Sequence, residues 1–121
     1  MKPRLLTMIA GIAFASAMLV SPAALADDSV LKIGQNLKYD MSVLRQHGLS
    51  ISPFDDTMVM SFALDAGRQG HGMDELSKLH LNHAPISYKS LTGTGKSQIS
   101  FAEVPVAEAT KYAAEDADVT L

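Results

Sequence analysis

The stretch that decides how this chain folds reads VLKIGQNLKYD and runs from Val30 to Asp40. Its first five residues, Val30–Gly34, are an apolar run broken by one lysine, which is typical of a short buried strand. Asn36 follows and is suited to cap a helix, because its side-chain oxygen can accept hydrogen bonds from the first free backbone amides. We expect that helix to extend from Leu37 to about His47, with Gly48 as the residue after its end. A strand that leads directly into a helix therefore opens the folded part of the chain.

Further elements follow this strand and helix at short intervals. The pattern predicts a short strand over Leu49–Phe54, a helix capped by Asp55 or Asp56 and ending at Gly67, a loop over Arg68–Gly72, a helix over Asp74–His80, and a last helix with Pro105 at its first position that runs to Leu121. Ser, Thr, Gly and Pro are frequent over Asn82–Ser100, and we expect that segment to be irregular. The order is one of short strands alternating with helices.

Composition limits the size and the kind of protein. The 121 residues are enough for one small domain, and the absence of cysteine excludes disulfides and thiolate zinc sites. After residue 26 the chain carries 8 basic and 13 acidic residues, a formal charge of −5. This balance argues against a broad DNA-wrapping surface, which is normally basic, but it allows a small local nucleic-acid site bridged by metal ions.

Residues 1–26 differ in character from the rest of the chain. Lys2 and Arg4 precede an uncharged apolar run over Leu5–Val20, and Ala24-Leu25-Ala26 offers the small residues that signal peptidase recognises. This three-part order predicts a secretory signal peptide and export to the periplasm, and the run is short for a membrane anchor. We therefore divide the chain into a signal-like segment, 1–26, and a domain, 27–121, with no stable membrane span after cleavage.

Two local patterns carry residues suited to chemistry. The first is Gln35–Asp40, where a helix that follows a strand has a carboxylate in its first turns. The second is Tyr112–Asp118, in which Tyr112 and Asp116 are four residues apart and share one helix face. Two such carboxylates can share divalent metals, and a nearby phenol can orient a water for attack on phosphorus. By spacing alone, Asp40 and Asp116 can equally be ordinary solvated helix residues.

Several segments together carry a resemblance to a known family. The stretches IGQNLKYD (residues 33–40) and YAAEDADVTL (residues 112–121) resemble the second and third exonuclease motifs of bacterial DNA polymerase I. Between them DTMVMSFALDAG, HGMDELSKLHL and GTGKSQISF resemble the same 3′–5′ proofreading domain, in the same order. The resemblance extends over residues 28–121. It implies an α/β domain of the ribonuclease-H-like, DnaQ-type exonuclease fold, with a mixed sheet, flanking helices and, in this chain, the first strands missing.

The resemblance also implies roles for individual residues. Asp40 and Asp116 match the aspartates that each ligate one of two Mg²⁺ or Mn²⁺ ions, and Tyr112 matches the tyrosine that orients the attacking water. Positions that contact a frayed single-stranded DNA 3′ end are matched by Gln35, Asn36 and Tyr39, and Arg68 matches an arginine near the scissile phosphate. The implied reaction is hydrolysis of phosphodiesters at a DNA 3′ end. We predict no protein partner.

The chain departs from the family at the first motif. That motif is an Asp-x-Glu pair on an upstream strand, whereas the signal-like segment of this chain contains no acidic residue. We therefore expect little or no catalysis by the chain alone, and an unpaired sheet edge at residues 30–33. The family works in the cytoplasm, which conflicts with export. Two alternatives remain: an exported, non-catalytic nucleic-acid-binding or structural remnant, and a gene fusion or truncation.

Overall fold

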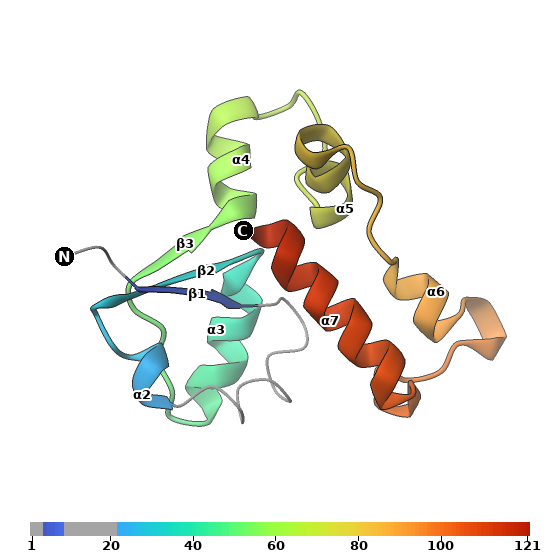
Figure 1. Cartoon of the computed structure of the whole chain (residues 1–121), viewed down its shortest axis with the longest axis horizontal. Coiled ribbons are helices and arrows are strands. Elements are labelled where there is room, and N and C mark those ends of the chain that lie inside the picture. The colour runs from blue at the N-terminus through green and yellow to red at the C-terminus, as the bar shows by residue number, and fades with distance from the viewer. Residues whose placement is uncertain (1–3, 9–21) are drawn as a thin grey trace.

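A three-stranded parallel sheet, in the order β1-β2-β3, lies on one side of the computed structural model, which describes residues 4–8 and 22–121. The strands are β1 (Arg4–Met8), β2 (Val30–Gly34) and β3 (Phe54–Asp56). Arg4 lies opposite Val30 and Met8 opposite Gly34, while on the other side of β2 the pairing runs from Lys32–Phe54 to Gly34–Asp56. All three strands therefore end at the same edge of the sheet (Figure 1).

The α/β class and the strand Val30–Gly34 are confirmed. A mixed sheet was expected, but every strand pairing in the described residues is parallel. The second strand was predicted over Leu49–Phe54, which is wrong because only Phe54–Asp56 pairs with β2. The apolar signal that suggested the earlier start comes from Ile51, which is 4% exposed and packs in the core outside the sheet.

The N-terminal segment contributes to the sheet. The sequence predicted an open edge along residues 30–33, but β1 pairs with β2 over its whole length. Much of the predicted signal peptide, residues 1–3 and 9–21, lies outside the described residues, so that prediction stays a prediction. Within the described ranges no helix is long and apolar enough to span a membrane.

The helices follow the predicted order with shifted ends. They are α2 (Pro22–Leu25), α3 (Leu37–Gln46), α4 (Thr57–Asp65), α5 (Met73–Leu76) continuing as the π-helical turn η1 (Ser77–Leu81), α6 (Tyr88–Thr92) and α7 (Val106–Thr120), with 3₁₀ turns η2 (Gly95–Ser97) and η3 (Phe101–Glu103). The predicted irregular segment over 82–100 therefore contains the 3₁₀ turn η2 and one short α-helix, α6, whose N-cap Ser87 accepts a hydrogen bond from the Ser90 amide. Pro105 is the N-cap of α7, one position earlier than expected.

A glycine ends α3 as predicted. Gly48 has a φ of 73° and donates from its amide to the Arg45 carbonyl at 3.1 Å, while the Leu49 amide donates to the Leu44 carbonyl at 3.0 Å. These two bonds are those of a Schellman motif, which satisfies the last carbonyls of a helix. Leu49 also packs against the core cluster that contains Leu44, so the turn directs the chain back under the helix.

The apolar core is small and joins α2 to α3. Leu25, Leu37, Leu44 and Ile51 are buried together, and Met41 and Leu49 pack against them. Leu25 is fully buried, and its carbonyl accepts a hydrogen bond from the Ser52 amide at 3.2 Å. The signal-peptide prediction places cleavage after Ala26, which would remove this core side chain.

Leu25→Ala should therefore destabilise the full chain by about 2–4 kcal/mol, because it leaves a cavity in a core with few other apolar side chains. Urea unfolding followed by circular dichroism measures this loss. Leu64→Ala is the matched control, since Leu64 is 81% exposed and its truncation should change the free energy of unfolding by less than about 0.5 kcal/mol. Equal losses for the two variants would show that Leu25 is not a core residue.

A buried lysine in β2 joins this strand to the chain segments on either side of it by hydrogen bonds. Lys32 is fully buried, and its Nζ donates to the carbonyls of Asp27 at 2.9 Å and Val30 at 2.7 Å, and to the carbonyl of Ser52. A buried ammonium is tolerated only when hydrogen bonds replace the water that it has lost. Lys32 therefore ties the strand to the segment that leads into β3.

Replacing Lys32 by Met should cost at least about 2 kcal/mol of unfolding free energy, because the carbonyls of Asp27, Val30 and Ser52 lose their charged donor. The same change at the exposed Lys38 should cost little. Thermal unfolding of the two variants beside the wild type makes the comparison. A Lys32→Met protein as stable as the Lys38→Met protein would contradict this role of Lys32.

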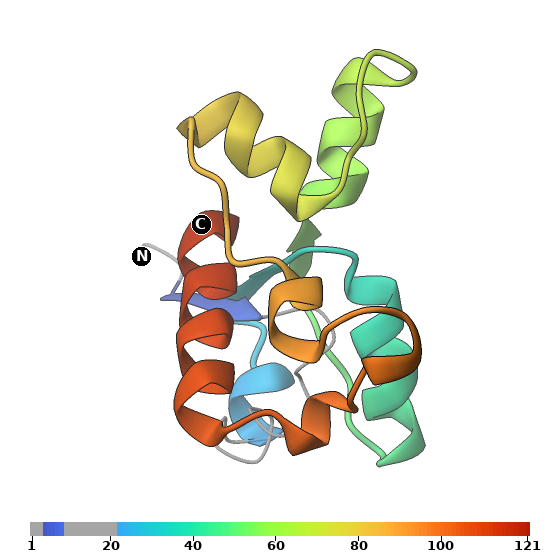
Figure 2. The same cartoon turned by 90° about the vertical axis from the view of Figure 1, so that its right-hand side faces the viewer.

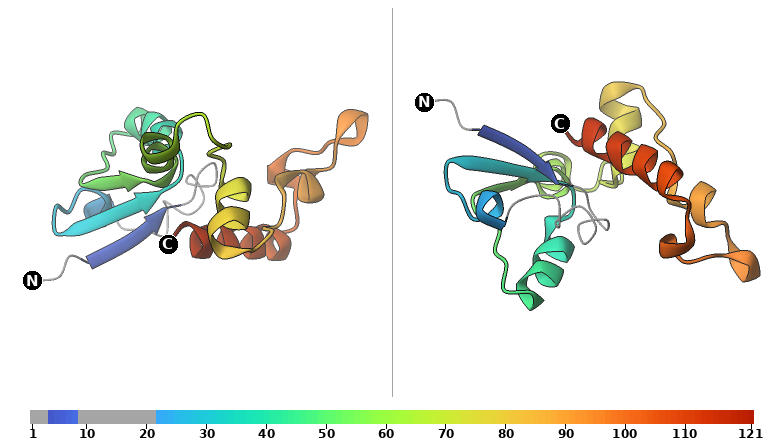
Figure 3. Two further views of the ribbon diagram at one scale, coloured as in Figure 1. Left: turned by 90° about the horizontal axis from the view of Figure 1, so that it is seen from above. Right: turned by 60° about the horizontal axis from the view of Figure 1, so that its bottom comes forward.

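The remaining elements are arranged around the carboxyl edge of the sheet. α7 ends beside the carboxyl ends of β1 and β2 and contacts both strands (Figure 1). Figure 2 shows α4 and α5 standing apart from the sheet, with α6 lying along α7. Seen from above in Figure 3, the sheet and α3 form one half of the molecule and α5, α6 and α7 the other. The two halves meet at this edge, where α7 contacts β1 and β2.

Candidate functional site

The turn between β2 and α3 is held by a carboxylate from another element. Asn36 has left-handed backbone angles, φ 57° and ψ 43°, and its side chain makes no capping hydrogen bond. Asp56 supplies the cap instead, with Oδ1 accepting from the Asn36 amide at 3.0 Å and Oδ2 from the Leu37 amide at 2.8 Å. The prediction that Asn36 caps the helix through its side chain is therefore wrong, although Asn36 does occupy the N-cap position.

Within this turn and the first turn of α3, burial differs sharply between neighbouring residues. Asp40 is 1% exposed, whereas Tyr39 is 61% exposed and Asn36 is exposed. A carboxylate buried to this degree is costly unless charged or polar groups compensate it. The fold thus holds Asp40 inside and leaves Asn36 and Tyr39 accessible to a ligand.

Gln35 and Arg68, two further predicted DNA-binding residues, differ in accessibility. Gln35 is 4% exposed; its Oε1 accepts from the Thr57 hydroxyl, and its Nε2 donates to the His71 carbonyl at 2.8 Å. Arg68 lies in the loop after α4, and its exposed guanidinium forms an ion pair with Asp65 at 3.1 Å. The side-chain amide of Gln35 therefore binds the loop after α4 at His71, while Arg68 is exposed to solvent.

Tyr112 and Asp116 lie one turn apart on α7. Asp116 is 3% exposed, and burial, together with the nearby Asp74 and Glu115 carboxylates, raises its pKa to about 6 despite a hydrogen bond from Tyr112. Burial first, and then the Asp116 charge, raises the pKa of the Tyr112 phenol above its usual value. The phenol therefore stays protonated near neutral pH and donates to Asp116.

Two aromatic rings surround the ring of Tyr112. Phe101 lies 5.9 Å from it between centroids, and Tyr88 lies 6.5 Å away in an edge-on arrangement. Tyr88 and Phe101 stack on each other at 5.8 Å with an interplanar angle of 16°. These contacts fix the orientation of the phenol, and the sequence reasoning had assigned no role to either Phe101 or Tyr88.

Glu115 anchors the segment before α6 to α7. Its Oε1 lies 2.8 Å from His83 Nε2, and its Oε2 accepts from the Ile86 amide at 2.6 Å. The Ile86 hydrogen bond, followed by that of His83, lowers the pKa of Glu115. Sequence reasoning missed this contact, because its residues are up to 32 positions apart and no local pattern links them.

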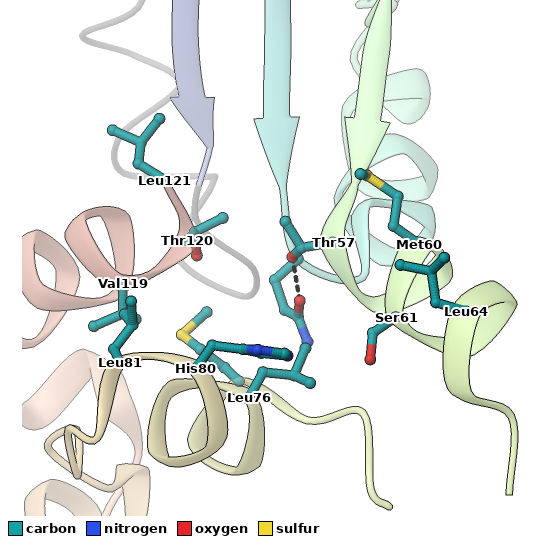
Figure 4. A pocket seen from close by; sticks show the side chains of 12 residues that line it. Thr57, Met60, Ser61, Leu64, Leu76, His80, Leu81, Val119, Thr120 and Leu121 are labelled. Carbon is teal, nitrogen blue, oxygen red and sulfur yellow. Dashed lines mark hydrogen bonds between the residues drawn. The ribbon is translucent and has the colours of Figure 1, made fainter. Parts of the chain in front are cut away.

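A hollow of about 290 Å³ opens beside this site, between α4, η1 and the end of α7 (Figure 4). Met60 and Leu64 line it from α4, Leu76 from α5, and Thr120 from α7. Gln35 is the only predicted site residue among the described side chains that line it. The hollow is therefore separate from the carboxylates that the sequence singled out.

Comparison with known proteins identifies the family. The family described as 3′–5′ exonuclease matches residues 12–121. The chain belongs to this exonuclease family. DNA polymerase I of Rhizobium leguminosarum is 54% identical over 99 residues, which cover 82% of this chain and 10% of that protein. DNA polymerase I of Pseudomonas aeruginosa is 40% identical over 100 residues, covering 80% of this chain and 11% of that protein. The exonuclease-family chain thus spans about a tenth of the length of these curated relatives.

Exonuclease families use divalent metal ions, so we asked whether the side chains of this chain could hold one. Asp40 and Asp116 are oxygen ligands of the kind that Mg²⁺ and Mn²⁺ prefer, and both are buried. The described residues, however, contain no group of three or more His, Cys, Asp or Glu placed to hold a metal ion. The chemistry of the two carboxylates fits such an ion, but their number does not complete its ligand set.

Asp116→Asn should stabilise the exonuclease chain at neutral pH. Between about pH 3.8 and pH 6, Asp116 is protonated in the folded protein and ionised in the unfolded chain. The free energy of unfolding therefore falls as the pH rises through this interval. The gain from Asn should be largest above about pH 6 and shrink as the pH falls towards 4, as measured by urea unfolding.

Asp118→Asn is the control for this measurement, because Asp118 is exposed on the same helix. It removes the same formal charge and should show no comparable pH-dependent gain. A gain for Asp116→Asn that is equal at pH 4 and pH 7 would mean that folding does not raise the pKa of Asp116.

Proposed function

We propose that this domain acts on the 3′ end of single-stranded DNA, as a 3′–5′ exonuclease domain of the DNA polymerase I type. Asp40 and Asp116 are the metal-binding carboxylates, and Tyr112 orients the attacking water. Asn36 and Tyr39 contact the DNA end, with Gln35 and Arg68 nearby. The family membership of residues 12–121 supports the reaction class.

One observation carries the proposal: the two motif aspartates are both almost fully buried, at 1% and 3% exposure. Solvated helix residues, the alternative that spacing left open for Asp40 and Asp116, would not be buried. The raised pKa of Asp116 adds that its charge is poorly compensated by the protein alone. A buried carboxylate with a perturbed pKa, such as Asp116, is typical of functional sites.

Each residue has a distinct part in the reaction. Tyr112 is a protonated phenol fixed by two aromatic rings, so it can hold one water by a hydrogen bond at a constant position. Asp40 and Asp116 would hold Mg²⁺ or Mn²⁺, which supplies Lewis-acid stabilisation of the phosphoryl charge when bound. The exposed Asn36 and Tyr39 orient the nucleotide beside them.

The site is incomplete in the described residues, and we propose that the chain alone therefore has little or no activity. β1 reads RLLTM and lies beside β2, so its carboxyl end shares the edge from which α3 begins. An Asp-x-Glu strand in that place would add two carboxylates near Asp40. With RLLTM there, we expect Asp40 and Asp116 together to hold at most one weakly bound divalent ion.

Replacing residues 4–8 by an Asp-x-Glu strand from a related domain should therefore switch on Mg²⁺-dependent removal of 3′ nucleotides from single-stranded DNA. In that protein Asp40→Ala and Asp116→Ala should each abolish activity by removing a metal ligand. Tyr112→Phe should be milder, slowing hydrolysis by about tenfold, because it removes one hydrogen bond to the water and leaves the ligands in place. Release of a 3′-labelled nucleotide from an oligonucleotide measures the rate.

Asp118→Ala is the control for these variants, since it removes an exposed carboxylate from the same helix. It should leave the rate unchanged. Full activity in the Asp40→Ala protein would show that the second motif has been assigned wrongly. An inactive grafted protein that folds and binds Mn²⁺ would count against the proposed reaction.

A further inference from the structure

One carboxylate, that of Asp56, caps two helices. Oδ1 accepts from the amides of Met58 at 3.0 Å and Val59 at 3.3 Å at the start of α4. The same oxygen accepts from the Asn36 amide at 3.0 Å, and Oδ2 accepts from the Leu37 amide at 2.8 Å at the start of α3. Asp56 is 7% exposed, so these four amides take the place of water around its charge.

The residue after Asp56 strengthens the same junction. The Thr57 hydroxyl lies 3.3 Å from the Gly34 carbonyl, and it donates to Gln35 Oε1. The β3–α4 turn thus contacts the β2–α3 turn through both backbone and side-chain groups. The start of α3 is consequently fixed by residues about 20 positions further along the chain.

This contact has a consequence for Asn36. A helix normally receives its cap from the side chain of its own N-cap residue. Here Asp56 does that, so the Asn36 side chain makes no capping bond and is exposed at the mouth of the turn. The left-handed backbone of Asn36, which is uncommon outside glycine, is stabilised by the bond from its amide to Asp56.

We propose that Asp56 is a positioning residue for the DNA 3′-end site. Because Asp56 caps α3, the side-chain amide of Asn36 remains available to the substrate. The same contact fixes the first turn of α3 and with it Asp40, one turn further along. This proposal rests on the proposed function, and Asp56 itself contacts neither DNA nor metal. Asp56 also joins the first turn of α3 to the first turn of α4, so loss of the contact changes the position of the substrate-facing residues more than the total helix content.

Asp56→Ser separates the two caps. Serine is a favoured N-cap, so its hydroxyl can still accept from the first amides of α4. Its side chain is one atom shorter and has a single acceptor oxygen, so it cannot also reach Asn36 and Leu37. Asp55→Asn is the matched control, because it removes a neighbouring exposed carboxylate of β3 that makes none of these bonds.

The test uses the full 121-residue chain under conditions in which circular dichroism shows each variant to be folded. In Asp56→Ser, hydrogen exchange should become at least about fivefold faster at the Asn36 and Leu37 amides and remain near the wild-type rate at Met58 and Val59, as expected for loss of one cap. Binding of a fluorescein-labelled oligothymidylate with a free 3′ hydroxyl, followed by anisotropy, should weaken by about fivefold or more. Asp55→Asn should change neither measurement.

Two results would overturn the positioning role. One is wild-type affinity in a folded Asp56→Ser protein whose Leu37 amide exchanges rapidly. The other is unchanged exchange at Asn36 and Leu37. If the wild-type chain binds no oligonucleotide, the proposed function fails; the exchange rates then still decide whether Asp56 fixes the start of α3, since they require no DNA.

Discussion

The junction between two strand–helix turns, closed by the Asp56 carboxylate, is the constraint on which the rest of this structure depends. Both turns leave a sheet at its carboxyl edge, and each begins a helix whose first amides lack intrahelical acceptors. A single buried charge satisfies both sets. The favourable field of two helix N-termini compensates that charge, so the carboxylate and the helices stabilise each other. The orientation of α3, and with it the site, follows from this contact.

Polar contacts have unusual weight here because the apolar core is small. Its buried cluster consists of Leu25, Leu37, Leu44 and Ile51. Around it lie a buried ammonium, Lys32, that bonds three carbonyls, and the buried amide of Gln35. Such groups add directional restraints that apolar packing lacks, and each is costly if one partner is lost. The geometry of the turn therefore depends on hydrogen bonds as much as on burial.

Two neighbouring carboxylates of α7, those of Glu115 and Asp116, have pKa values shifted in opposite directions. Glu115 is ionised favourably, since an amide and a histidine bind its oxygens, and its pKa is lowered. Asp116, the next residue, is buried among other carboxylates, and its pKa is raised. The first side chain stabilises the fold, whereas the second costs stability when charged. A bound cation would compensate this charge, and the raised pKa of Asp116 therefore supports the metal site proposed for this chain.

The sequence by itself determined the local elements and the family. The strand Val30–Gly34, the glycine end of α3 and a cap of α4 by Asp55 or Asp56 could be predicted, because propensity, periodicity and capping act between residues a few positions apart. The structure selects Asp56. The motif residues Asp40, Tyr112 and Asp116 were singled out by their spacing together with the resemblance to the exonuclease motifs. Their burial could not be read from spacing.

Only the tertiary structure decided which residues meet. It placed Arg4–Met8 beside β2, gave the capping of α3 to Asp56 in place of Asn36, engaged Gln35 with a loop 36 residues away, and tied Glu115 to His83. Each of these contacts joins separate elements. Whether they form depends on the path of the whole chain, since burial and charge compensation are shared among elements that no local sequence pattern connects.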